Sequence, residues 1–223
     1  MLSEYWKEDC MDNHKPRARC KCTNVQTVTV HGPAIQGPPG PPGAGAIIPY
    51  ASGTTPVALS TTDVAGVIVS TGAIVGFGSS APTVDLNTGT LTLGVGAGNI
   101  PDFAFVVPRA GTVTSISAFF SATVGITLAA AGTVRAELWR STTGGVPDPA
   151  SNTFTPTGVF VDLVPAFGPT VNVGDTAAGT APAALPVAAG DKLLLVVSLR
   201  TSGPTPINIG VLTGFVSAGV GIS

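Results

Sequence analysis

Glycine recurs at every third position in a short proline-rich segment, Gly37-Pro38-Pro39-Gly40-Pro41-Pro42-Gly43. Three polyproline-II chains that wind around a common axis need this spacing, because only glycine fits at the crowded centre. The segment therefore predicts that three chains associate. Only Gly37, Gly40 and Gly43 keep the period before Gly45 ends it, so the residues that follow must organise the trimer. The alternative is a stiff Pro-Gly linker without a triple helix.

Charged residues of the 223-residue chain, ten Lys+Arg and twelve Asp+Glu in all, are concentrated at its N-terminus, where residues 1–22 hold nine of them. The formal net charge of −2 gives no electrostatic basis for binding nucleic acid or an anionic membrane surface. From residue 47 onward the chain is mostly Val, Ala, Thr, Gly, Ile, Leu and Pro. A chain this poor in charge is expected to cover much of its surface with copies of itself or within an insoluble assembly.

Neither a secretory signal nor a membrane span is expected. The charges of Glu4 and Lys7 lie where the apolar region of a signal peptide would begin. Residues 64–84 are uncharged and long enough to span a bilayer. Several glycines and Pro82 divide this stretch into the short runs Val67–Val69 and Ala73–Val75, which are more typical of buried strands.

All three cysteines, Cys10, Cys20 and Cys22, lie in the charged N-terminal arm. Cysteines in an arm cannot crosslink a body that has none, so we expect disulfides between chains. Together with His14 they form the pattern C-x3-H-x5-C-x-C. The final C-x-C is tighter than the spacing of structural zinc modules, which makes zinc the weaker alternative.

Four segments follow one another along the chain. Residues 1–24 form the charged arm, and residues 25–36 form a connector that opens with the predicted strand Val25-Gln26-Thr27-Val28-Thr29-Val30. Residues 37–46 form the collagen-like stub, and residues 47–223 form one globular domain.

The domain is predicted to be all-β, because short runs of β-branched and aromatic residues alternate with Gly, Pro, Asn and Asp. The nine prolines from Pro147 to Pro206 are expected to fall between strands. The predicted strands are Val67–Val69, Ile74–Phe77, Thr90–Leu93, Phe103–Val107, Thr112–Phe120, Ile126–Leu128, Thr133–Trp139, Gly158–Leu163, Thr170–Val173, Lys192–Leu199 and Ile207–Val216.

Two of these runs predict how their side chains are divided between the faces of a sheet. Alternation in Val134–Arg140 places Arg135, Glu137 and Trp139 on one face. Trp139 is interpreted as a core residue and Arg140 as a surface residue. The run Lys192–Leu199 is apolar on both faces, which predicts a strand between the core and a neighbouring subunit.

The residues needed for common enzyme mechanisms are missing from the domain. It has no histidine and no cysteine, which excludes Ser-His-Asp and Cys-His catalysis and histidine-based metal sites. Its carboxylates occur singly, mostly beside turn residues, as is typical of turn capping. The glycine-rich stretch Gly94–Gly98 lacks the lysine and the helix of a phosphate-binding loop. We expect no enzyme, no cofactor and no metal.

Several blocks of the domain are similar to a known family. They are Gly43–Gly53 with Pro56–Leu59, Gly76–Pro82, Phe103–Ile116, Asn152–Pro156 and Ser217–Val220. In this order they resemble the C-terminal domain of the BclB family of Bacillus exosporium glycoproteins, over about residues 43–223. The resemblance implies a trimeric jelly roll, related to the tumour-necrosis-factor and C1q-like folds, carried on a collagen-like stalk at the spore surface. The stub has no Thr for glycosylation, and the exosporium-targeting leader typical of the family is missing.

These features predict a structural protein of the spore surface that assembles by itself. In the main hypothesis, Val25–Val30 of each subunit adds to a sheet edge or fills a groove in the next trimer, which builds a fibre head to tail. Disulfides from Cys20 and Cys22 would then lock neighbours together. Alternatively, the arm tethers a single trimer to a coat or exosporium anchor, and the head acts as an adhesin or binding module. A virion or phage tail-tip adhesin is a further possibility.

Overall fold

The domain is built entirely of β-strands in the part of the chain that the structure describes. This computed structural model describes residues 45–64, 67–94, 102–141, 152–201 and 210–223. The chain divides into two units, Met1–Pro42 and Gly43–Ser223, and all described residues belong to the second. No helix in these ranges is long and apolar enough to cross a membrane.

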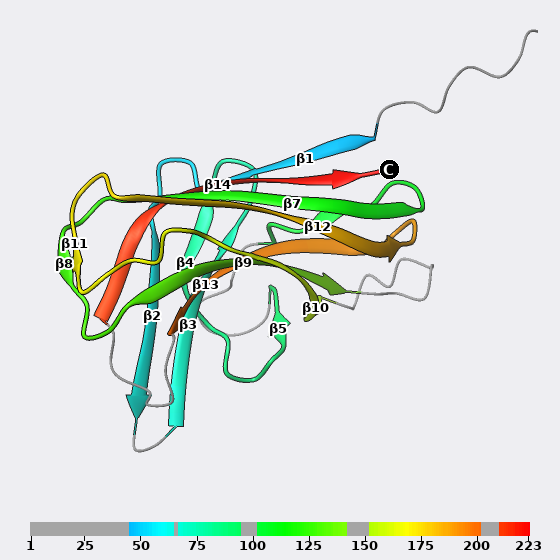
Figure 1. Cartoon of the computed structure of the whole chain (residues 1–223). Coiled ribbons are helices and arrows are strands. Elements are labelled where there is room, and N and C mark those ends of the chain that lie inside the picture. Colours follow the sequence, from blue (N-terminus) through cyan, green and yellow to red (C-terminus); the bar gives the residue numbers. More distant parts are fainter. Residues whose placement is uncertain (1–44, 65–66, 95–101, 142–151, 202–209) are drawn as a thin grey trace, which may run out of the picture. The chain divides into compact units, whose positions relative to one another are not determined.

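Most of the predicted strands are present, and several are longer than expected (Figure 1). The two runs predicted around residues 67–77 are one continuous strand. The strands are β1 (Ala46–Ala51), β2 (Val57–Val64), β3 (Val67–Val75), β4 (Ser80–Asp85), β5 (Leu91–Thr92), β6 (Phe105–Val106), β7 (Gly111–Ala122), β8 (Ile126–Thr127), β9 (Gly132–Ser141), β10 (Thr153–Asp162), β11 (Thr170–Val171), β12 (Thr176–Val187), β13 (Lys192–Thr201) and β14 (Gly210–Ile222).

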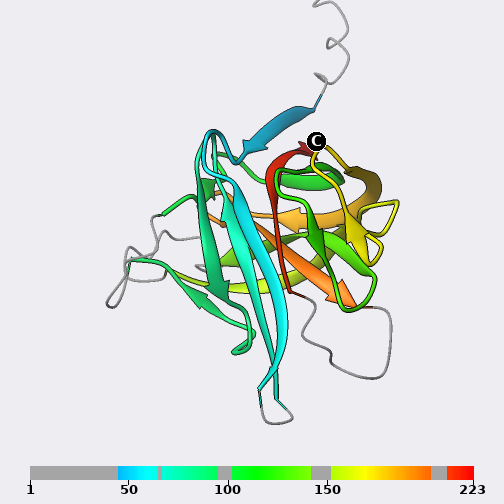
Figure 2. The ribbon, with the colours of Figure 1, turned by 90° about the vertical axis from the view of Figure 1, so that its left-hand side faces the viewer.

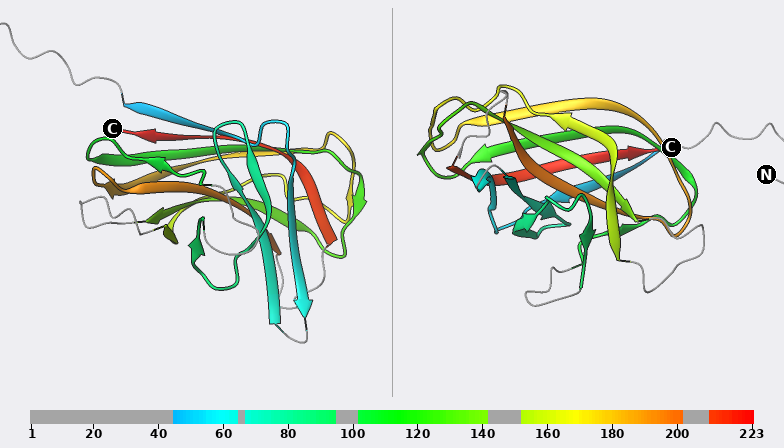
Figure 3. Two further views of the ribbon diagram at one scale, coloured as in Figure 1. Left: turned by 180° about the vertical axis from the view of Figure 1, so that it is seen from behind. Right: turned by 90° about the horizontal axis from the view of Figure 1, so that it is seen from below.

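One antiparallel sheet of twelve strands folds over to make two layers. Its strand order is β12-β7-β14-β2-β3-β13-β9-β10-β5, while β1 pairs with β14, β4 with β3, and β6 with β13. In Figures 1 and 3, β1, β14, β7 and β12 lie together as one layer, and β13, β9 and β10 lie in the other. Figure 2 shows β2 and β3 as a long pair along one side of the domain.

The free side of β12 meets the chain again just after β10. Val164 and Ala178 exchange two backbone hydrogen bonds, with N···O distances of 3.0 and 2.9 Å. Gly132 and Phe167 form a second such bridge. These contacts link the two ends of the strand order and enclose the main core between the layers.

Strand β13 contributes to two separate cores because its side chains alternate between faces. Leu193, Leu195 and Val197 enter the main core between the layers. The opposite face was predicted to pack against a neighbouring subunit, and that prediction is wrong, because the chain covers this face itself. The second core consists of Ile74, Val84, Leu91, Leu93, Trp139, Phe154, Leu194 and Val196.

The prediction that prolines fall between strands is also wrong at several positions. Pro156 lies in β10, and Pro182 and Pro186 lie in β12. Both strands shift register at or next to these residues, after Pro156 in β10 and after Pro182 in β12. Near its prolines β12 pairs only with β7 among the described residues, so a missing N–H need not interrupt a ladder on its outer side.

Candidate interaction surface

The layer formed by β1, β14, β7 and β12 carries no formal charge. None of these four strands contains Asp, Glu, Lys or Arg. Side chains alternate along each strand, so about half of them enter the core and the rest form an outer face. The outer face consists of small or apolar residues, among them Ile47, Ser117, Phe119, Ala178, Thr180, Phe215, Ser217 and Gly219. We call this outer face of the four strands the uncharged face.

The middle of the uncharged face is hollowed. A shallow depression of about 530 Å³ lies over β7, β12 and β14, and residues such as Ser117, Gly179 and Ser217 line it. The hydroxyls of Ser117 and Thr180 are 2.8 Å apart and hydrogen-bond across the two strands. Because the lining apart from Phe119 is backbone and short side chains, another protein surface can approach closely and few rotamers would be immobilised.

Three larger apolar side chains stand out from the uncharged face. Ile47 is 77% exposed, Phe119 42% and Phe215 40%. Scattered apolar residues are normal on protein surfaces, but a contiguous uncharged area with exposed aromatic residues is typical of a protein contact. The uncharged face therefore has the composition of an interface core.

The other layer carries charged pairs on its outer side. Arg135 of β9 donates two hydrogen bonds to the carboxylate of Asp162, at 2.7 and 2.8 Å, and its guanidinium lies 3.7 Å from the ring centroid of Phe160. The hydrogen bonds from Arg135 hold the pKa of the Asp162 carboxyl below its ordinary value. Hydrogen bonding to Asp162 likewise raises the pKa of Arg135. Ion pairs at this exposure suit a solvated surface.

The uncharged layer contains the first strand of the described chain. Strand β1 begins at Ala46, shortly after Gly43, and pairs antiparallel with the end of β14, where Ala46 lies opposite Ile222. The described part of the chain therefore enters the domain at the end of this layer where β14 finishes.

The residues that sequence predicted as assembly sites lie outside the described part of the chain. These are Cys10, Cys20 and Cys22, the strand Val25–Val30, and the stub glycines Gly37, Gly40 and Gly43. The described residues hold no cluster of three or more His, Cys, Asp or Glu that could bind a metal ion. Trp139 is buried, as interpreted, and Arg140 is partly exposed, with its Nη1 donating to the carbonyl oxygen of Pro186 at 2.9 Å.

The uncharged face was not predicted from the sequence, although part of its signal was visible. The runs 111–122, 176–187 and 210–222 each lack charge. They lie far apart in the chain, and only the pairing register places Ser117 opposite both Thr180 and Gly219. Strand β12 had not been predicted at all.

Comparison with known proteins gives one clear similarity, while no family model matches the chain. The chain is 34% identical over 190 residues to "Collagen-like protein 1" of Acanthamoeba polyphaga mimivirus. It is distantly similar to a collagen-like protein. The match covers 82% of this chain and 19% of the relative, so the chain spans about a fifth of that protein's length. Because the stub is short, most of the matched residues lie in the β domain. This relation suggests a structural or surface protein, whereas no family, the BclB family included, is identified.

Proposed function

We propose that this chain is a structural surface protein whose β domain forms a homotrimer through the uncharged face. The observation that carries the proposal is the division of charge between the two layers. One layer bears the Arg135–Asp162 pair, and the other has no charged residue in any of its four strands. An extensive surface without charge is unfavourable to expose to water. Contact with a second and a third copy of the chain would remove it from water.

The strand order supports a jelly roll, the fold that a trimeric head of this kind would have. Strands β1, β14, β7 and β12 neighbour one another, as do β3, β13, β9 and β10. Along the chain, β7 belongs to the first group, β9 and β10 to the second, β12 to the first, β13 to the second and β14 to the first. Such crossings between two antiparallel layers are what Greek-key connections produce.

A charge placed on the uncharged face tests the trimer. Ser217 is exposed in the single chain and lines the hollow, so Ser217→Asp should fold. In a trimer the three carboxylates would be buried without partners, at a cost of several kcal/mol each. Thr127→Asp on β8 is the matched control, because Thr127 is also exposed but lies in the separate β8–β11 pair.

Sedimentation velocity gives the readout. Wild type and Thr127→Asp should sediment with three times the mass of one chain, and Ser217→Asp with the mass of one. A monomeric wild type would overturn the trimer. A Ser217→Asp protein that stays trimeric with unchanged stability would assign the trimer to another surface.

We further propose that these trimers join head to tail into a fibre at the spore surface. Val25–Val30 of one trimer would add to the next, and Cys10, Cys20 and Cys22 would form disulfides between subunits. The chain itself would be the main partner, with a coat or exosporium protein as anchor, and no reaction is assigned to it. The proposal rests on the sequence of the arm and on the resemblance to spore-surface proteins.

Electron microscopy of negatively stained protein separates a fibre from a tethered head. We would compare the full chain with a chain that begins at Gly37, each with and without reductant. Filaments from the full chain alone support assembly through the arm. Discrete particles from both chains overturn the fibre and favour a single tethered trimer, and filaments from the shortened chain exclude a role for Val25–Val30.

A further inference from the structure

A second, smaller hollow lies on the outer side of the charged layer. Its volume is about 220 Å³, smaller than the roughly 300–1,000 Å³ of sites for drug-sized ligands. The hollow is formed by one chain and shares no residue with the uncharged face, so it has no part in the proposed assembly. Its lining residues are Ser70, Leu86, Gly89, Arg135, Glu137, Trp139, Pro156, Val196, Ser198 and Arg200.

The charged groups of this hollow are of both signs, and they differ in how firmly they are held. Arg135 is held in place by Asp162 and by the ring of Phe160. Within the described residues, the side chains of Arg200 and Glu137 form no hydrogen bond or ion pair, although both charges act on the nearby Arg135–Asp162 pair. Arg200 is exposed and lines the hollow. The hollow therefore offers one cation and one carboxylate whose side chains have no hydrogen bond among the described residues, beside a fixed guanidinium.

Trp139 adds an apolar part to the same lining. The side chain is 4% exposed and packs in the second core. Its indole N–H is buried without an acceptor in the described part of the chain, although buried donors are normally satisfied. An occupant that brings oxygen atoms would find an apolar wall with an unpaired donor nearby.

We propose that this hollow binds a single acidic sugar residue, a hexuronate at the end of a glycan. The volume suits one ring rather than an extended ligand. Sugar hydroxyls both donate and accept hydrogen bonds, which matches a lining that has an acceptor in Glu137 and donors in Arg135 and Ser198. The carboxylate of the sugar would pair with Arg200, whose side chain forms no hydrogen bond or ion pair in the described residues. This inference goes beyond the proposed structural role and does not depend on it.

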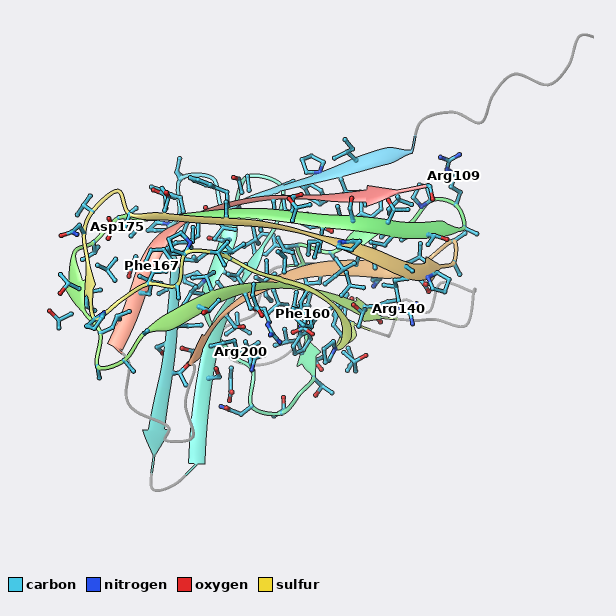
Figure 4. All side chains as sticks on the ribbon, viewed as in Figure 1. Arg109, Arg140, Phe160, Phe167, Asp175 and Arg200 are labelled. Atoms are coloured by element: carbon cyan, nitrogen blue, oxygen red, sulfur yellow. The ribbon has the colours of Figure 1, made fainter. Side chains whose placement is uncertain are left out.

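The test is a titration of the full-length protein with methyl β-D-glucuronide and with methyl β-D-glucoside, followed by saturation-transfer NMR. We expect the glucuronide to bind at least fivefold more tightly than the glucoside. Arg200→Ala should weaken glucuronide binding at least fivefold. Arg109→Ala removes the same charge at the opposite end of the domain (Figure 4) and should bind like wild type. Equal binding of both sugars, no binding of either, or wild-type binding by Arg200→Ala would overturn the proposal.

Glu137→Gln distinguishes a sugar site from a patch that merely attracts anions. If Glu137 accepts a hydrogen bond from a sugar hydroxyl, the amide should weaken glucuronide binding severalfold. If the hollow only attracts negative charge, removing the carboxylate should strengthen binding, and that result would refute the sugar. The α-amide of N-acetylglutamate, which has one carboxylate and no ring, should bind at least fivefold more weakly than the glucuronide, whereas equal binding would assign the hollow to acidic peptides.

Discussion

Leu194→Ala should destabilise the domain clearly, although less than a substitution in its main core. Leu194 is fully buried and belongs to the second core, on the face of β13 that sequence assigned to a neighbouring subunit. It lies opposite Trp139 in the ladder with β9. The next residue, Leu195, is also fully buried but points into the main core, between Val75 and Leu138.

The expected magnitude follows from this burial. A fully buried Leu→Ala change costs about 2–5 kcal/mol, the larger values applying where the surroundings cannot collapse into the cavity. The second core is smaller than the first and is covered by loops and short strands, so it can relax further. We therefore expect about 2–3 kcal/mol for Leu194→Ala and about 3–5 kcal/mol for Leu195→Ala. In a domain of this size each kcal/mol lowers Tm by about 2–4 °C.

Denaturant unfolding and sedimentation at the same protein concentration measure both consequences. Both variants should lose stability, and both should keep the oligomeric state of the wild type. A Leu194→Ala protein with wild-type stability but a changed oligomeric state would refute the reasoning. It would mean that this face of β13 is covered by another subunit, as the sequence had suggested.

Two further substitutions test close packing and a buried phenol. Gly214→Ala should lower the free energy of unfolding by about 1–3 kcal/mol, because an added Cβ would clash with the carbonyl oxygen of Ser121 and the ring of Phe120. Gly168→Ala is the control: this glycine has open space around it, so the substitution should change the free energy of unfolding by less than about 0.5 kcal/mol. Tyr50→Phe should leave stability at neutral pH unchanged or raised, because the Tyr50 hydroxyl is buried without a hydrogen-bond partner in the described residues. Burial raises the pKa of the Tyr50 phenol well above its ordinary value, so the wild type should lose stability relative to Tyr50→Phe as pH rises above about 10, where the unfolded phenol ionises. Ultraviolet titration and thermal unfolding at several pH values check this, and a Tyr50 that titrates normally in the folded protein would contradict it.

The sequence predicted the β class and most strands because their physical signals are local. In β9, alternation assigned Val134, Ala136 and Leu138 to one face and Trp139 to the other, and both cores confirm that assignment. Strand β12 escaped prediction because Thr176–Val187 is mostly Ala, Gly, Thr and Pro, residues of low or mixed β-propensity. It is a strand because β7 provides a ladder along nearly its whole length, and that tertiary cause is invisible in a local window.

The same composition affects the outer side of β12, which pairs with no further strand near its prolines among the described residues. An exposed edge invites pairing with other chains, and proteins commonly protect it with charges or with proline. Strand β12 contains no charged residue, but Pro182 and Pro186 lack the backbone N–H groups that could donate to an added strand. The edge is therefore poorly suited to adding another strand, while the flat face beside it stays free for contact. Because that face presents mostly small side chains, its contact energy would be spread over many residues. Truncating Ser217 to Ala should then leave a trimer intact, although Ser217→Asp should dissociate it.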